Sequence, residues 1–231
     1  MKYFVDEKSI VRQIWRKSDT VLLIFAGSAA EFALNKAVDW LYFTGKIPTN
    51  PLERLFSTVE FAQKIVFSEN EIALATIDKI TEIHQGVEKS RGKTIPDWAY
   101  RDVLYMLIDY SIRSFELLER KLETNEKKEI FDVFNRLGIR MGLKDLPGNC
   151  EEWLIDRNIH LENNLQKGKF TIHLFEQYKK HLGSFRYSIL IQIQKVLVPK
   201  IVFEKLFKTR YFPTAALLKL YKICRKIKID Y

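Results

Sequence analysis

Two side chains that can bind a metal or an anion, His84 and Arg54, lie on neighbouring stretches with a helical pattern. A neutral imidazole is a good metal ligand, and a guanidinium recognises carboxylates. Because an α-helix has 3.6 residues per turn, Ser57, Thr58 and Phe61 share one stripe with Arg54. The spacing indicates that a buried prosthetic group could sit between the two helices.

The helices that must position these residues begin at recognisable signals. Pro51 is a favourable first helical residue, because its missing N–H needs no partner there. A second helix is expected from about residues 68–69, with an apolar stripe that consists of Ala73, Ile77, Ile80, His84 and Val87. This stripe directs His84 inward, where a buried imidazole needs a hydrogen-bond partner or a metal.

A plainer interpretation of the same residues stays open. A single histidine on an apolar stripe is usually a core residue bonded to a backbone carbonyl or a hydroxyl, and no second ligand stands at a metal-site interval from His84. Arg54 could cap the C-terminus of a neighbouring helix or pair with a carboxylate. Periodicity alone does not decide between these interpretations.

Four ordered segments resemble the rubber-oxygenase family, which includes the latex-clearing protein and the mycophenolic-acid pathway oxygenase. They are 50–58 (NPLERLFST), 83–87 (IHQGV), 100–119 and 137–147 (LGIRMGLKDLP). The third is similar to the family's long central helix, and the fourth to its helix–Gly–Leu-Pro corner. The likeness extends from about Ser18 to Asn164.

The resemblance implies an all-helical fold that holds haem b, with His84 as the iron ligand. The family's distal Arg-x-x-Lys-Thr element matches Arg54, Ser57 and Thr58, so a serine stands where the latex-clearing protein has its lysine. Serine is too short to reach iron as lysine could, and we expect a five-coordinate or water-ligated iron that is open to oxygen. Arg54 would bond a propionate or the oxygen, Thr58 would offer its hydroxyl on the distal face, and Phe61 would contact the cofactor.

The favoured function is that of a haem b-dependent oxidoreductase, an oxygenase that uses O2 on a small or hydrophobic organic substrate. A haem oxidoreductase with a polar substrate is a second hypothesis, because Arg54 can also bind a carboxylate through two bonds. A third hypothesis is a haem-free helical interaction module whose basic C-terminal surface meets a partner or a membrane. The colour of the purified protein separates the third hypothesis from the other two.

Composition favours one all-α domain over residues 1–231. The chain is 47% hydrophobic and 13% aromatic, and its 9 Gly and 6 Pro are few for the turns of an all-β protein. We expect a bundle of about nine or ten helices that encloses the haem pocket, including helices near 19–42, 51–67, 69–88, 97–121, 171–181, 184–197 and 213–227. Gly142 is expected to end the helix that begins near Thr124.

The positive charge is concentrated in the C-terminal part. Residues 165–231 contain 15 Lys and Arg against 3 Asp and Glu, whereas residues 1–164 carry a net charge of −3. The segment 215–227 has the pattern of a basic amphipathic helix, which could lie on an anionic membrane, follow nucleic-acid phosphates or form a solvated rim. Nucleic acid is the least favoured, because no recognised motif is present.

The sequence also leads to expectations about the location of the protein and the state of its two cysteines. Residues 1–6 do not resemble a secretory signal, and the apolar run 20–30 is too short to span a bilayer. We expect a cytoplasmic protein, with attachment to a membrane surface through the basic C-terminal helices as the alternative. The two cysteines, Cys150 and Cys224, suggest reduced thiols, and a helix start after Asn149 could lower the pKa of Cys150.

Two acidic residues have open interpretations. Asp156 and His160 are four residues apart on one expected helix and are interpreted as an exposed ion pair rather than a metal site. Asp109, in the middle of the helix near 97–121, either partners a histidine or arginine or lies at an exposed edge.

Overall fold

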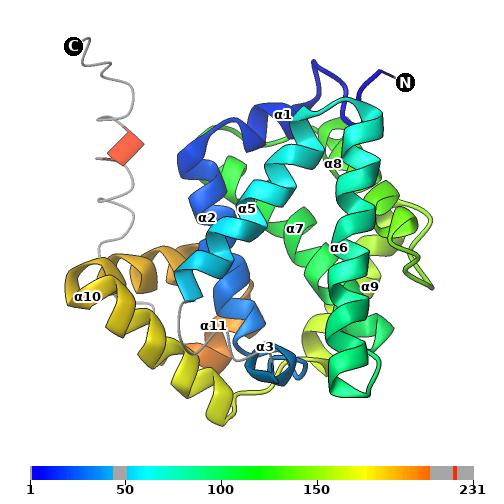
Figure 1. The fold of residues 1–231 in the computed structure, drawn as a ribbon. Coiled ribbons are helices and arrows are strands. Elements are labelled where there is room, and N and C mark those ends of the chain that lie inside the picture. The colour runs from blue at the N-terminus through cyan, green and yellow to red at the C-terminus, as the bar shows by residue number, and fades with distance from the viewer. Residues whose placement is uncertain (1, 44–50, 209–220, 223–231) are drawn as a thin grey trace.

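The computed structural model describes residues 2–43, 51–208 and 221–222, of which residues 51–57 are described by their backbone alone. These residues form ten helices: α1 (Ile10–Trp15), α2 (Ser18–Phe32), α3 (Asp39–Phe43), α5 (Pro51–Phe67), α6 (Asn70–Arg91), α7 (Asp97–Leu118), α8 (Thr124–Arg140), α9 (Cys150–Asn163), α10 (Lys169–Leu197) and α11 (Lys200–Leu206) (Figure 1). In this part of the chain, β-pairing is limited to two isolated bridges, Tyr3–Glu69 and Asn35–Leu165. The expected all-α fold is confirmed.

Two helices, α2 and α7, pack against each other in the centre of the main hydrophobic core. The apolar run 20–30 lies in α2, and Ile24 and Ile108 on the two helices are fully buried. Gly27 allows the close approach, because a Cβ at this position would overlap the ring of Tyr110. No helix in the described residues is both long enough and apolar enough to cross a membrane.

The expected single helix over 19–42 is wrong, because the chain leaves the helical conformation between α2 and α3. The side chain of Asn35 accepts a hydrogen bond from the backbone N–H of Ala37 at 2.8 Å and donates one to Asp102 at 2.6 Å. The backbone N–H of Lys36 donates to the carbonyl of Asn164, and that of Gln166 donates to Leu34. These tertiary bonds replace the bonds that a continuous helix would make.

Other helix boundaries agree with the sequence signals. Helix α5 spans the predicted residues 51–67, and α6 begins at Asn70 and extends to Arg91, three residues beyond the predicted end. Gly142 ends α8 with φ +78°, and Gly183 interrupts α10 with φ +71° between the two predicted helices. The predicted helix 213–227 lies almost wholly outside the described residues.

Candidate functional site

The helices α5 and α6 position the residues singled out in the sequence. They follow each other through a short turn and diverge from it, with α7 passing behind the wider part (Figure 1). Arg54 lies 13 residues before the last residue of α5, and His84 lies 14 residues after the first residue of α6. At 1.5 Å per residue, both backbone positions are about 20 Å from the turn. The fold therefore gives these two residues matching positions on two diverging helices.

His84 is half-buried, and its ring is packed against that of Tyr100 at the start of α7. The ring centroids are 5.2 Å apart with an interplanar angle of 75°, an edge-to-face arrangement. The Tyr100 hydroxyl donates to Oε1 of Glu88 at 3.2 Å, and the same oxygen accepts the backbone N–H of Ile95 at 2.8 Å. The ring that restricts the imidazole is thus itself held by a carboxylate one turn along α6.

The electrostatic state of Tyr100 follows from these contacts. Burial and the neighbouring carboxylate of Glu88 raise the pKa of Tyr100 far above its ordinary value of 10.0. Its hydroxyl is therefore a neutral donor to Glu88 throughout the physiological range.

The predicted apolar stripe of α6 is confirmed at its N-terminal end and becomes more open towards His84. Ala73 and Ile77 are fully buried, whereas Ile80, His84 and Val87 are half-buried. A pocket of about 150 Å³ lies beside the imidazole. Residues of α6 and α7 line it together with Met141 and Leu143. This pocket has room for water or a small polar molecule. Its lining comes from α6, the start of α7 and the residues that follow α8 and includes no described residue of α5, so it is distinct from the space between α5 and α6 in which a prosthetic group is expected.

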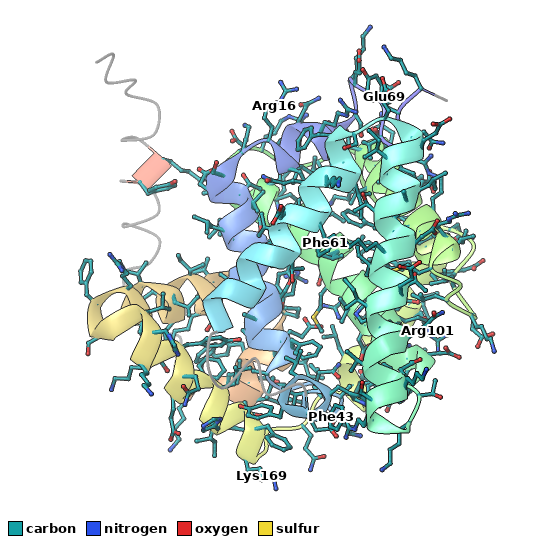
Figure 2. The ribbon with its side chains drawn as sticks, in the orientation of Figure 1. Arg16, Phe43, Phe61, Glu69, Arg101 and Lys169 are labelled. Carbon is teal, nitrogen blue, oxygen red and sulfur yellow. The ribbon has the colours of Figure 1, made fainter. Side chains whose placement is uncertain are left out.

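On α5, the structure describes two of the four predicted site side chains. Thr58 is exposed, and Phe61 is half-buried and lies between α5 and α6 in the view of Figure 2. The side chains of Arg54 and Ser57 lie outside the described residues, so their predicted contacts stay predictions. Ile65 and Val66, nearer the turn, are buried in the main core and fix this end of α5.

Arg91, the last residue of α6, is a charged residue that the sequence analysis missed. Its Nη2 atom donates to Oδ2 of Asp39 in α3 at 2.6 Å. Its guanidinium carbon lies 3.9 Å from the ring centroid of Trp40 and 5.3 Å from that of Phe43. The Nη1 atom is buried and has no hydrogen-bond partner among the described residues. The available signal was its spacing, because Arg91 continues the stripe seven residues after His84.

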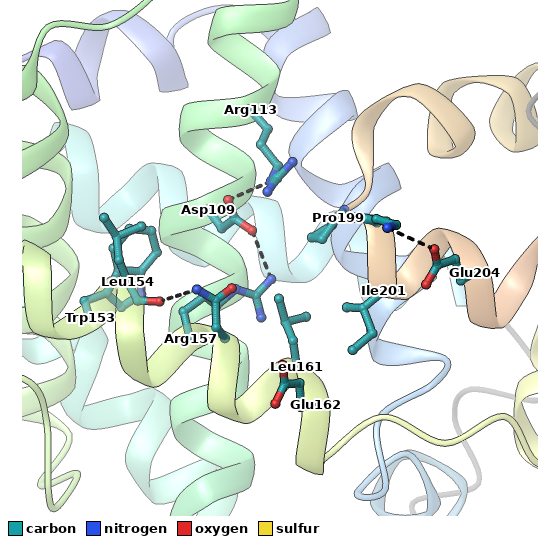
Figure 3. A pocket seen from close by; sticks show the side chains of 12 residues that line it. Asp109, Arg113, Trp153, Leu154, Arg157, Leu161, Glu162, Pro199, Ile201 and Glu204 are labelled. Atoms are coloured by element: carbon teal, nitrogen blue, oxygen red, sulfur yellow. Dashed lines mark hydrogen bonds and ion pairs between the residues drawn. The ribbon is translucent and has the colours of Figure 1, made fainter.

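A larger pocket, of about 400 Å³, lies between α7, α9 and α11 (Figure 3). Arg157 of α9 reaches Asp109 of α7 at 3.1 Å here, and it makes two further bonds to the buried carboxylate of Glu31 in α2. Asp109 also accepts from Arg113 at 2.7 Å. Asp109 is therefore a buried partner of arginines and does not lie at an exposed edge. These opposite charges pair with one another and tie α2, α7 and α9 together.

Asp156 and His160 do approach each other across one turn of α9, at 3.7 Å, but the prediction that this pair is exposed is wrong. His160 is buried, and its Nδ1 atom lies 2.5 Å from Oδ1 of Asp102 in α7. Asp156 accepts the hydroxyl of Tyr105 at 2.5 Å, and its other oxygen is 3.7 Å from Nε2 of His160. The spacing along α9 could not reveal Asp102, which comes from another helix. The described residues contain no cluster of three or more histidine, cysteine, aspartate or glutamate side chains that could hold a metal ion.

The suggestion of a lowered thiol pKa at Cys150 is also wrong. Asn149 caps α9 as expected, with its side chain accepting the backbone N–H of Glu152 at 2.8 Å. However, burial and the charge of Glu151 raise the pKa of Cys150 above its ordinary value. Burial outweighs the helix N-terminus, and Cys150 is a packing residue.

Comparison with known proteins supports the resemblance that the motifs indicated. Residues 15–153 match the family model described as "ER-bound oxygenase mpaB/B'/Rubber oxygenase, catalytic domain". No curated protein and no solved structure matches the chain. The matched residues include α5, α6, α7 and α8, and with them His84, Thr58 and Arg91. Since the match covers more than half of the sequence, the chain belongs to this family of oxygenase catalytic domains.

Proposed function

We propose that the protein is a haem b-dependent oxygenase that acts on a small or hydrophobic organic substrate, with His84 as the protein ligand of the iron. The observation that carries this proposal is the placement of His84 on α6, level with the arginine of the family's distal element on α5. Membership of an oxygenase family supports the reaction class. The identity of the cofactor and of the substrate class is our inference.

The residues around His84 fit a haem by their chemistry. A half-buried imidazole on a long helix is a common axial ligand of haem iron. The buried Nη1 atom of Arg91, on the same helix, is a donor that no described residue satisfies. When bound, haem b would supply an iron that binds and activates O2.

Each residue would have a separate task. Tyr100 restricts the plane of the imidazole through its edge-to-face contact, much as partners in the outer shell orient metal-bound histidines. On α5, Arg54 would bond a propionate or the oxygen, and Thr58 would offer a hydroxyl on the distal side. Ser57 would leave room for substrate, because its short side chain cannot reach the metal. Phe61, half-buried, would form an apolar contact with the cofactor.

The test is the visible spectrum of the full chain purified from haem-replete cells. We expect a Soret band in the wild type and its loss in His84→Ala, because the imidazole is the proposed protein ligand of the iron. His181→Ala is the matched control, since His181 is a half-buried histidine on α10, and it should retain the band.

Two results would contradict the proposal. A wild-type protein that stays colourless after hemin is supplied would favour the haem-free helical interaction module. A band retained in His84→Ala would reject His84 as the ligand. Contact of the basic C-terminal part with a membrane surface stays a prediction, as does a cytoplasmic location.

A further inference from the structure

Arg91 uses only part of its hydrogen-bonding capacity. A guanidinium has five N–H donors in a planar fork. In the described residues, Nη2 of Arg91 bonds Asp39 at 2.6 Å, whereas Nη1 is buried without a partner. A buried donor that bonds neither protein nor water costs free energy, so such an atom needs an explanation. The simplest explanation is a ligand that supplies the missing acceptor.

The position of Arg91 relates it to His84. The two residues are seven positions apart on α6, which places them on nearly the same face, about 10 Å apart along the axis. The guanidinium is also held in place, because it stacks on Trp40 and bonds Asp39 in α3. A ligand bound by His84 and extending along α6 towards its C-terminal end would meet a preformed donor.

The chemistry of that donor selects an anion. A guanidinium forms its strongest hydrogen bonds with carboxylates and phosphates. The carboxylate of Asp39 bonds Nη2, and its side chain is 37% exposed, so water also solvates this carboxylate. The guanidinium therefore keeps the capacity to bind a second anion. Haem b carries two carboxylates at one edge, remote from its iron.

We propose that Arg91 binds a propionate of the haem that His84 ligates, and that the N–H of its Nη1 atom is the donor. This proposal rests on the proposed function and adds an anchor on α6, on the side of the imidazole. Asp39 and Trp40 act as positioning residues, since they fix the plane of the guanidinium. Arg54 on α5 stays available for the second propionate or for the oxygen.

The experiment compares hemin with hemin dimethyl ester, in which both carboxylates are blocked. Dissociation constants are measured by Soret titration for the wild type, Arg91→Gln and Asp39→Asn, with circular dichroism to verify that each variant is folded. We expect the wild type to bind hemin roughly 10- to 100-fold more tightly than the ester, the range of a hydrogen bond to a charged group. Arg91→Gln should lose most of this preference, mainly through weaker binding of hemin.

Asp39→Asn tests whether Arg91 anchors the haem or only holds α3 against α6. This variant removes the charge of the α3–α6 ion pair but keeps a side-chain oxygen that can accept from Nη2, so the guanidinium stays positioned and the preference for hemin should be kept. If Arg91 serves only to hold α3, the two variants should behave alike, and that result would overturn the proposal. Arg91→Lys is the second variant if Arg91→Gln does not fold, and it should show a reduced preference, because an ammonium cannot bond two carboxylates through a planar fork.

The failures of the two proposals can be told apart. Equal affinity of the wild type for hemin and its ester, with a Soret band that depends on His84, would reject the role of Arg91 alone. Absence of any Soret band in the wild type would reject both proposals.

Discussion

The half-buried imidazole of His84 depends on its neighbours for a fixed orientation. Tyr100 supplies the ring contact at 5.2 Å, and Glu88 holds the hydroxyl of that tyrosine at 3.2 Å. Glu88 and His84 lie one turn apart on the same helix, so the three residues form a closed set that links α6 to α7. The set restricts rotation of the imidazole through the ring contact of Tyr100.

This set predicts a measurable coupling between Tyr100 and Glu88. Tyr100→Phe keeps the aromatic ring and removes the hydroxyl, and we expect it to lower the free energy of unfolding by about 1 kcal/mol, the net value of one hydrogen bond. A double-mutant cycle of Tyr100→Phe and Glu88→Ala, measured by urea unfolding, should give a coupling energy of the same order. Additive effects would show that the two side chains do not stabilise each other, and that His84 is not held in this way.

At the scale of helices, the sequence was informative wherever a local signal determines an element. Pro51 marked the start of α5, and Gly142 marked the end of α8, where the backbone adopts a positive φ. Local signals did not predict the break in the helix at Asn35, because this residue bonds Asp102 and pairs with Leu165, both distant in the sequence. The same reason explains His160, whose partner is on another helix.

The same distinction between local signals and tertiary contacts applies to the candidate site. The spacing along α6 identified the stripe that contains His84, because a stripe on a single helix depends only on local spacing. The ring contact between His84 and Tyr100 and the bond between Arg91 and Asp39 join residues that are distant in the sequence. The periodicity of α6 contains no information on these contacts. Arg91 lies on the selected stripe, but only the structure reveals that one of its donors is buried without a partner among the described residues.

The packing of α2, α7 and α9 depends on the buried charges of Glu31, Asp109 and Arg157. The side chain of Arg157 is 4% exposed and that of Glu31 1% exposed, so removal of the arginine leaves the buried carboxylate of Glu31 without its cationic partner. We expect Arg157→Met to lower the free energy of unfolding by about 3–5 kcal/mol. The measurement is urea unfolding followed by circular dichroism.

Arg113→Ala is the matched control for this prediction. Arg113 also pairs with Asp109, but its side chain is 39% exposed, and we expect a loss of at most about 1 kcal/mol. Similar losses in the two variants would mean that the buried triad does not determine how the three helices pack.

At the scale of the whole molecule, several tyrosines contribute to the buried interior or its edge. Tyr105 and Tyr110 are fully buried on α7, and each donates its hydroxyl to a carboxylate, Asp156 and Glu31 respectively. Burial, together with these carboxylates, raises the pKa of both tyrosines well above the ordinary 10.0. The neutral hydroxyl is therefore the form that the fold requires.

These raised pKa values predict how stability depends on alkaline pH. Below about pH 10 the tyrosines are protonated in both the folded and the unfolded state, so their contribution to stability is complete. As the pH rises further, the unfolded chain loses these protons while the folded protein keeps them, and the free energy of unfolding falls. Each such tyrosine contributes up to about 1.4 kcal/mol per pH unit to the slope. Absorbance at 295 nm should therefore report tyrosinate for these residues only as the helical circular dichroism disappears.

Tyr105→Phe provides the control for this linkage. It should destabilise the protein at neutral pH, because Asp156 loses its donor, and yet make the decline above pH 10 shallower by the slope of one tyrosine. Lysine deprotonation in the same range affects the wild type and the variant alike, so the difference between their slopes isolates the phenol. An unchanged slope, or ionisation of all tyrosines near pH 10 in a protein that is still helical, would contradict the view that the interior of this bundle keeps its tyrosines neutral.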